Sequence, residues 1–355
     1  MIVVDAHEDI AYNALAFGRD YRRSALAIRQ DEAGTEIPVR NGMATVGMPD
    51  ALLGRVALTF ATLFVAPRTR NTAPWDILTY TEPKEAYEIA MRQLDYYERI
   101  ADEHDKINLI RTQAELNAVL ATWEEGKEIT DHQIGLVVLM ENADPILEPK
   151  QFEEWYERGV RIVGPAWKAS RYCGGTGEPG PLTDLGRELL EVMASFNAIL
   201  DLSHMAEASF LESIDRYEGV IIASHSNPRR FRNSDRHLSD EMIRRLAERD
   251  GVMGIVLYNY FLTEDWDKRQ RLPFSVIADA IDYVCQITGS AAHVGIGSDL
   301  DGGFGRESIP QGLDTVGDLL RIADALRERG YEEDDIAAIM GGNMIRKLRQ
   351  SLPEA

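Results

Sequence analysis

Residues 134–140 read Ile-Gly-Leu-Val-Val-Leu-Met and are followed directly by Glu141. The run has the length of a β-strand and lacks the alternation of polar and apolar residues that a half-exposed strand shows. Uninterrupted apolar runs of this kind are typical of parallel strands that are buried on both faces. Seven further runs recur along the chain: Ile2–Val4, Val56–Val65, Arg161–Ala166, Ala198–Leu202, Val220–Ala223, Val252–Tyr258 and His293–Gly297.

Several segments between these runs have the apolar spacing of amphipathic helices. Ala86, Ala90, Leu94 and Tyr97, for example, fall on one face of a charged segment, and similar patterns precede the fifth, seventh and eighth runs. Strands that alternate with helices predict βαβ units and a parallel sheet. Eight strands favour a closed (β/α)8 barrel of the TIM type, and an open doubly wound sheet is the alternative.

The chain shows no sign of a division into domains, because it has no Pro/Ser-rich linker and no internal repeat. We therefore expect residues 1–355 to form a single barrel domain, with C-terminal helices at about 315–350. An irregular insertion at about 31–50 follows the first strand, and a Gly-rich loop at 172–181 follows the fourth. A barrel places its functional site in the loops that follow its strands, so both segments are candidates to border a site.

The composition excludes several classes of protein. The formal net charge of −21 over 355 residues leaves no basic field to collect phosphates, so we expect no nucleic-acid partner and no anionic membrane partner. Two cysteines exclude a disulfide framework and a Cys-rich zinc site, so any metal must be held by His and carboxylates. The N-terminal residues lack the features of a signal peptide and no stretch has the length of a membrane span, which predicts a cytoplasmic protein.

Three of the seven histidines follow the ends of predicted strands: His7, His204 and His225. A barrel gathers the carboxyl ends of its strands around one mouth, so these imidazoles should converge. Residues two apart in an extended segment point to the same side, and His7 and Asp9 can therefore bind one ion together while Glu8 faces away. Convergent His and carboxylate side chains are typical ligands of Zn²⁺.

Two more strand ends carry carboxylates. Glu141 closes the apolar run 134–140, where burial is costly unless the charge is paired or bound to a cation. Asp299 and Asp301 follow the last run within Gly-Ser-Asp-Leu-Asp-Gly, residues 297–302, and either acid could hold a metal or transfer a proton. Each residue taken alone also fits an ordinary surface acid, turn or core histidine. Their joint placement at strand ends predicts a metal-dependent site.

The residues that carry this pattern resemble the membrane (renal) dipeptidase family, peptidase M19, within the amidohydrolase superfamily. The resemblance keeps its order over nearly the whole chain and rests on seven motifs: Asp5-Ala6-His7-Glu8-Asp9, Met140-Glu141-Asn142, Asp201-Leu202-Ser203-His204, Ser224-His225-Ser226-Asn227, Arg236-His237-Leu238-Ser239-Asp240, residues 295–302, and Gly341-Gly342-Asn343. It implies a (β/α)8 barrel of the metal-dependent hydrolase kind that cleaves the amide bond of a dipeptide or a similar small molecule.

The resemblance also implies roles for individual residues. His7 and Asp9 would hold one zinc ion, His204 and His225 would hold a second, and Glu141 would bridge the two. The nucleophile would be a hydroxide shared by the ions, because Zn²⁺ lowers the pKa of bound water toward about 7. Manganese, cobalt or iron also suit such ligands. A homodimer is a further expectation from the family.

Two residues outside the metal set also receive roles from the resemblance. Asp299 would take a proton from the attacking water and pass it to the leaving amine. Arg236 would bind the terminal carboxylate of the substrate through its fork of donors. The alternative for Arg236 is a surface residue in the basic run 229–236.

The chain departs from the family at one position of the pocket. Where the family has a histidine that contacts the scissile carbonyl, this chain has Trp167. Tryptophan offers one N–H donor and no positive charge, so it can stabilise an oxyanion only in part. Lys168 and Arg171 are candidates to replace the missing histidine. Three interpretations follow: a dipeptidase, an amidohydrolase acting on a lactam, cyclic amide or N-acyl amino acid, or an inactive metal-binding homologue.

Overall fold

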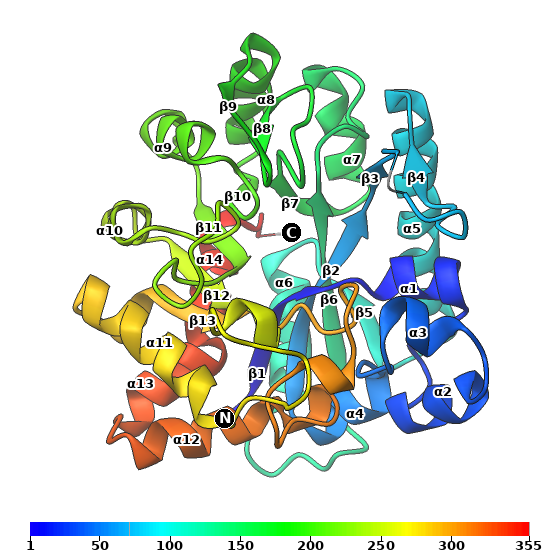
Figure 1. The fold of residues 1–355 in the computed structure, drawn as a ribbon, viewed down its shortest axis with the longest axis vertical. Coiled ribbons are helices and arrows are strands. Elements are labelled where there is room, and N and C mark those ends of the chain that lie inside the picture. The colour runs from blue at the N-terminus through cyan, green and yellow to red at the C-terminus, as the bar shows by residue number, and fades with distance from the viewer. Residues whose placement is uncertain (71, 355) are drawn as a thin grey trace.

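Eight parallel strands close into a barrel in the computed structural model, which describes residues 1–70 and 72–354 (Figure 1). The ring closes because β2 pairs with both β1 and β6, and β1 pairs with β13. The prediction of a TIM-type barrel is confirmed, and the open sheet is wrong. In ring order the strands are β1 (Val3–Glu8), β2 (Val56–Phe64), β6 (Ile134–Glu141), β7 (Val160–Gly164), β10 (Ile199–Asp201), β11 (Ile221–Ser226), β12 (Val252–Ile255) and β13 (Val294–Ile296).

The strand β6 illustrates why these segments form a barrel. All of its residues are buried, so neither face carries a polar alternation. It pairs with β2 in unbroken register from Leu58–Gly135 to Phe64–Glu141, which brings Glu141 to the carboxyl rim of the barrel. A short strand that the apolar runs did not predict, β5 (Ile107–Leu109), pairs with the first residues of β6.

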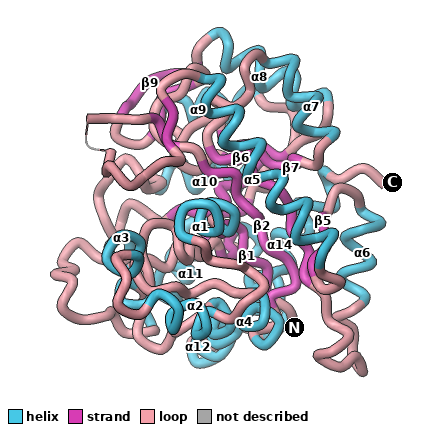
Figure 2. The backbone as a smooth tube through the Cα atoms, turned by 90° about the vertical axis from the view of Figure 1, so that its right-hand side faces the viewer, coloured by secondary structure: helices cyan, strands magenta, loops and turns pink. Residues whose placement is uncertain are grey.

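Helices cover the outside of the barrel, as Figure 2 shows from a second direction. The longest is α5 (Pro83–Glu103), which begins with a capping box between Glu82 and Glu85 and buries the face that contains Ala86, Ala90 and Leu94. The other helices are α1 (Ile10–Phe17), α2 (Ala25–Glu32), α3 (Ile37–Asn41), α4 (Met48–Leu53), α6 (Gln113–Ala121), α7 (Phe152–Glu157), α8 (Asp184–Ser195), α9 (Glu207–Arg216), α10 (Asp240–Glu248), α11 (Ser275–Thr288), α12 (Ile322–Glu328), α13 (Glu333–Ala337) and α14 (Asn343–Ser351).

Two small sheets and one insertion border the carboxyl rim. The Gly-rich loop forms a hairpin of β8 (Cys173–Gly175) and β9 (Glu178–Leu182), and β3 (Ala66–Pro67) pairs with β4 (Thr79–Tyr80). The segment at 31–50 contains the end of α2, all of α3 and the start of α4. The backbone N–H and the hydroxyl of Thr45 both donate to Asp301 at 2.7 Å, which ties this segment to the loop after β13.

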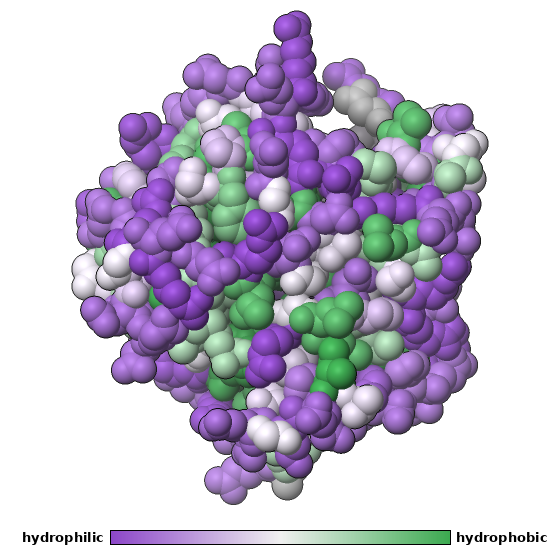
Figure 3. All heavy atoms as spheres, turned by 90° about the horizontal axis from the view of Figure 1, so that it is seen from below, coloured by the Kyte–Doolittle hydropathy of each residue, from purple (hydrophilic) through white to green (hydrophobic). Residues whose placement is uncertain are grey.

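The exposed large apolar side chains include Leu26, Val39, Leu53 and Ile77. Seen from below, the molecule is mostly hydrophilic, with a few apolar areas near the centre (Figure 3). Among residues 1–70 and 72–354, no helix combines the length and the apolar character that crossing a bilayer requires.

Three strands approach one another closely beneath the rim. A Cβ atom added to Gly297 would lie 1.9 Å from the carbonyl oxygen of Ser224 on β11, and one added to Gly254 would lie equally close to it. A residue with a side chain cannot occupy either position without movement of the backbone. These glycines therefore set the spacing of β11, β12 and β13 next to His225.

We expect Gly297→Ala to reduce the free energy of unfolding by about 2 kcal/mol or more, because the methyl group collides with backbone and not with a flexible side chain. Gly295→Ala in the same segment is the matched control, since its nearest neighbour would lie at 3.5 Å, an ordinary contact distance. Denaturant unfolding of both variants measures the difference. Equal stability of the two variants would contradict the close approach.

Candidate functional site

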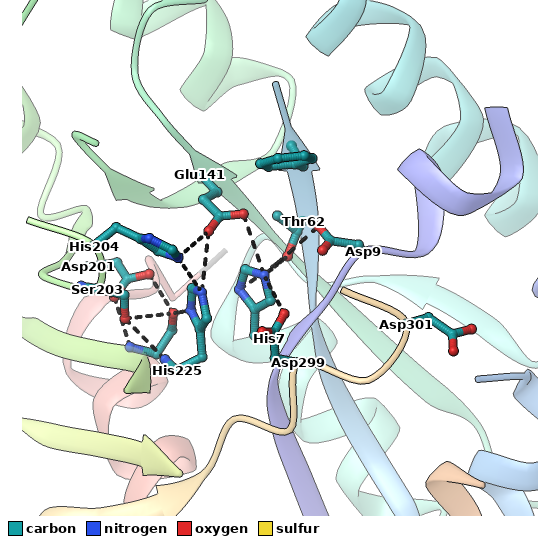
Figure 4. Close-up of polar contacts among 12 residues, drawn as sticks. His7, Asp9, Thr62, Glu141, Asp201, Ser203, His204, His225, Asp299 and Asp301 are labelled. Carbon is teal, nitrogen blue, oxygen red and sulfur yellow. Dashed lines mark hydrogen bonds and ion pairs between the residues drawn. The ribbon is translucent and has the colours of Figure 1, made fainter. Parts of the chain in front are cut away.

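Five side chains from four strand ends meet at the carboxyl rim of the barrel (Figure 4). His7 lies on β1 and Asp9 follows that strand, Glu141 ends β6, His204 follows β10, and His225 lies on β11. Their donor atoms form two overlapping groups, within each of which all atoms lie within 4.8 Å of one another. One group contains His7, Asp9 and Glu141, and the other contains Glu141, His204 and His225. The structure thus brings together all five predicted ligands.

Glu141 belongs to both groups because its two oxygens face different histidines. Its Oε1 lies 3.0 Å from Nε2 of His204 and 3.3 Å from Nε2 of His225. Its Oε2 lies 3.5 Å from Nε2 of His7. A carboxylate in this position can bridge two ions.

The donor atoms are arranged as they would be around a cation. Nε2 of His204 and Nε2 of His225 are 3.1 Å apart, and Oδ1 of Asp9 is buried with no hydrogen-bond partner among residues 1–70 and 72–354. Tetrahedral zinc with bonds of about 2.0–2.1 Å separates its ligand atoms by about 3.3 Å. Burial, reinforced by the Arg236 charge, lowers the pKa of His7 to about 3 and keeps the pKa values of His204 and His225 well below normal. The imidazoles are therefore neutral, which is the form that binds a metal.

The outer nitrogen of each histidine in the second group has a partner that orients the ring. Nδ1 of His225 lies 2.8 Å from the hydroxyl of Ser224, which in turn donates to the carboxylate of Asp201. Nδ1 of His204 lies 3.0 Å from the hydroxyl of Thr176 on the β8–β9 hairpin. These contacts favour the tautomer that leaves Nε2 of both rings free toward Glu141.

Two buried aspartates clamp neighbouring strand ends in the same way. Asp201 accepts from the backbone N–H groups of Ser203 and Ser224, at 3.0 and 2.8 Å. Asp5 accepts from the backbone N–H of Ser298 at 2.7 Å and from the Ser298 hydroxyl. The sequence motifs contain both acids, but the sequence alone does not reveal this role, because Ser224 and Ser298 come from other strands or the segments that follow them.

The two acids of the loop after β13 have different environments. Oδ1 of Asp299 lies 3.8 Å from Nε2 of His7, and burial together with the Asp9 charge raises the pKa of Asp299 well above its normal value. Asp301 points away from the cluster (Figure 4) and accepts from Thr45 while it pairs with Arg19 at 3.3 Å. Asp299 can therefore exchange a proton at the site, whereas Asp301 anchors the insertion.

A cavity of about 540 Å³ opens above the cluster and is bordered by Glu141, Asp299 and Arg236. Arg236 is 6% exposed, and its guanidinium donates to the carbonyl of His225 at 2.7 Å and to the hydroxyl of Ser226 at 3.3 Å. It forms no ion pair with any residue in the described part of the chain. A buried guanidinium with free donors on a cavity wall is a site for an anion.

Trp167 also borders the cavity, where its ring centre lies 6.3 Å from that of His204. Of the two candidates to replace the family histidine, Lys168 lines the cavity. Arg171 instead donates to the carboxylate of Asp144 and to the carbonyls of residues 144, 146 and 147, so its guanidinium is engaged outside the cavity. Of these two candidates, Lys168 is therefore the one that borders the cavity.

The model of the membrane dipeptidase family, peptidase family M19, matches residues 1–353. This chain belongs to that family. The prediction of an M19 barrel is thereby confirmed.

Individual relatives of this M19 chain agree with the match. An uncharacterized protein of Klebsiella pneumoniae is 30% identical over 57% of this chain and 76% of its own length. The chain spans 38% to 63% of the length of four other curated relatives. Among solved structures, a Rhodobacter sphaeroides metallopeptidase bound to a phosphinate mimic of L-Ala-D-Ala has a TM-score of 0.77 at 22% identity, covering 99% of both chains. A probable dipeptidase of Pseudomonas aeruginosa has a TM-score of 0.78 at 19% identity, covering 100% of this chain and 96% of its own, and both likenesses concern the fold.

We expect the protein to bind a divalent transition metal, and Glu141→Ala to weaken this binding strongly, because the variant loses the one ligand common to both groups. At a free metal concentration a thousandfold above Kd, binding should stabilise the native protein by about 4 kcal/mol, and chelation should remove that stabilisation. Elemental analysis and thermal unfolding measure both effects. His104→Ala is the control, and equal metal content in both variants would contradict the assignment.

His237, the residue after Arg236, is fully buried. Its ring packs edge-on against Phe261 at 4.8 Å, and neither ring nitrogen has a hydrogen-bond partner among the described residues. Burial, followed by the charge of Arg236, lowers the pKa of His237 to about 3. The unfolded chain binds the proton at the normal pKa of 6.5. The contribution of His237 to the free energy of unfolding is therefore fully present above that pH and is lost as the pH falls toward 3.

Between pH 7 and pH 5, this single group should reduce the free energy of unfolding by about 2 kcal/mol. His237→Asn removes the titrating group, so the variant should lose less stability over this range than the native protein. Denaturant unfolding at both pH values gives the comparison, and the other histidines contribute equally to both proteins. Parallel losses in the two proteins would show that His237 is not held neutral.

Proposed function

We propose that this protein is a two-zinc hydrolase that cleaves the amide bond of dipeptides or similar small amides. The observation that carries the proposal is the position of Glu141 between two groups of metal-type ligands, beneath a cavity that also contains Asp299 and the unpaired Arg236. The family is called membrane dipeptidase, and the Rhodobacter relative is a metallopeptidase that was crystallised with a dipeptide mimic.

The ligand groups divide naturally between two ions. His7 and Asp9 would hold the first, His204 and His225 the second, and Glu141 both. When bound, the ions would lower the pKa of a water molecule to near neutrality and polarise the scissile carbonyl. The side chains are prepared for this role, because the imidazoles are neutral and the hydroxyls of Ser224 and Thr176 orient two of them.

Asp299 is the candidate for proton transfer. Its carboxylate borders the cavity, where it lies next to His7 and close to His225. It would accept the proton of the attacking water and return it to the amine that leaves. Arg236 would hold the substrate's terminal carboxylate, so that the amide carbonyl lies over Glu141 and the metal ligands.

A second candidate function keeps the metal site and changes the substrate to a lactam, a cyclic amide or an N-acyl amino acid. Trp167 favours it, since an indole at this position offers no charge to the scissile carbonyl of a dipeptide. An inactive homologue is the third possibility, but a protein that only binds metal has no need of Asp299. The cytoplasmic location and the homodimer stay predictions.

The test is a zinc-loaded protein offered a panel of L,L- and L,D-dipeptides, together with lactams and N-acyl amino acids. We expect dipeptide hydrolysis, and we expect Asp299→Asn to reduce kcat by about a hundredfold or more with unchanged metal content. Higher kcat/KM for the other amides would favour the second candidate. An Asp299→Asn variant that is as active as the native protein would refute the enzymatic role.

In the same assay Arg236→Lys should raise KM for dipeptides by about tenfold or more, because lysine cannot reproduce the bidentate contact with a carboxylate. Dipeptide amides, which lack the terminal charge, are the control substrate and should respond much less to the substitution. An equal response to the two substrates would contradict the carboxylate-binding role.

A further inference from the structure

The cavity above the metal ligands has two aromatic walls. The first, here called the Trp167 wall, consists of Tyr12, Phe64, Trp75 and Trp167, which come from α1, β2 and the loops after β3 and β7. Phe64 contacts Trp167 edge-on, with ring centres 5.2 Å apart, and contacts Tyr12 in the same way at 5.3 Å. The rings of Tyr12, Phe64 and Trp167 therefore form a continuous apolar surface.

The second wall, here called the Phe261 wall, consists of Tyr258, Tyr260, Phe261 and Phe304, from the loops after β12 and β13. The rings of Tyr258 and Phe304 are stacked at 4.3 Å, and the guanidinium of Arg232 lies 3.4 Å from the centre of the Tyr260 ring. Protein groups thus already occupy faces of these rings. Such stacking is absent from the contacts of Trp167 with Phe64, which are edge-on.

The position of Arg236 decides which end of a substrate meets each wall. Its guanidinium lies 5.8 Å from the ring of Phe261, so a carboxylate bound there places the carboxyl-terminal residue against the Phe261 wall. The Trp167 ring lies instead 6.3 Å from that of His204 and, among the described residues, makes no ring contact with the Phe261 wall. The amino-terminal residue, whose carbonyl is attacked, must then direct its side chain to the Trp167 wall.

We propose that the Trp167 wall is a specificity pocket for dipeptides whose amino-terminal residue has an aromatic or large aliphatic side chain; this inference rests on the proposed function. A cavity of about 540 Å³ is in the size range of pockets for drug-sized molecules, and a small dipeptide leaves much of it filled with water. An aromatic side chain buries about 150–250 Å² and can pack against Trp167 and Phe64, which border the cavity and are partly exposed. Burial of that area favours its binding over that of alanine.

The experiment compares kcat/KM of the zinc-loaded protein for L-Phe-L-Ala, L-Ala-L-Phe and L-Ala-L-Ala. We expect kcat/KM for L-Phe-L-Ala to exceed that for L-Ala-L-Ala by about fiftyfold or more. The advantage of L-Ala-L-Phe over L-Ala-L-Ala should be smaller. Equal values for L-Phe-L-Ala and L-Ala-L-Ala would overturn the inference. So would a preference confined to the carboxyl-terminal side chain.

Variants of the two walls locate the selectivity. Trp167→Ala should reduce the ratio of kcat/KM for L-Phe-L-Ala to kcat/KM for L-Ala-L-Ala by about tenfold. Trp167→Phe should retain most of this ratio. Tyr260→Ala, on the opposite wall, is the matched control and should leave this ratio unchanged. An unchanged ratio in Trp167→Ala, or an equal loss in both alanine variants, would refute the assignment.

Failure of the proposed function remains distinguishable from failure of this inference. If no dipeptide is hydrolysed, binding of phosphinate analogues of L-Phe-L-Ala and L-Ala-L-Ala to the zinc-loaded protein decides, measured by calorimetry. Tighter binding of the aromatic analogue, lost in Trp167→Ala, supports the specificity pocket without catalysis. Equal affinity for the two analogues overturns it.

Discussion

The Glu141 carboxylate is buried at the end of β6, within 3.5 Å of three imidazole nitrogens that are neutral. Burial raises its pKa well above normal, and the charges of Asp9 and Asp299 raise it further. Acids and lone pairs crowded in this way repel one another unless a cation lies between them. The need for a cation at one point of the rim explains the composition of the site: neutral histidines, a shared carboxylate, and two further acids, Asp9 and Asp299, beside His7.

The scaffold holds these groups by contacts between neighbouring strands. Asp201 links β10 to β11, and Asp5 links β1 to the segment after β13. In both cases a buried carboxylate accepts from the backbone and the hydroxyl of a serine on the next strand. The ligands therefore lie at strand ends, whereas Arg236 and the wall residues other than Tyr12 and Phe64 lie in the segments that connect strands and helices. In a TIM barrel the loops after the strands can vary while the strands keep their positions.

In the loop after β13, two acids that are close in sequence have different roles. Asp299 and Asp301 are two residues apart and both have a left-handed backbone, with φ of 58° and 62°. One side chain points to His7, and the other holds Thr45 and Arg19. The insertion that follows β1 depends on this second contact, so the same short segment positions a candidate proton carrier and fixes one edge of the cavity.

Local sequence determined the barrel and its five candidate ligands. Buried parallel strands require continuous apolar runs such as 134–140, and residues at strand ends must meet at one rim once the ring closes. It did not determine which of Asp299 and Asp301 faces the cluster, whether Lys168 or Arg171 lines the cavity, or which partners orient His204 and His225. These side-chain positions depend on contacts between loops that are far apart in the sequence, such as the hydrogen bond from Thr45 to Asp301. Only the folded chain sets such distances, because no periodicity relates residues on separate loops.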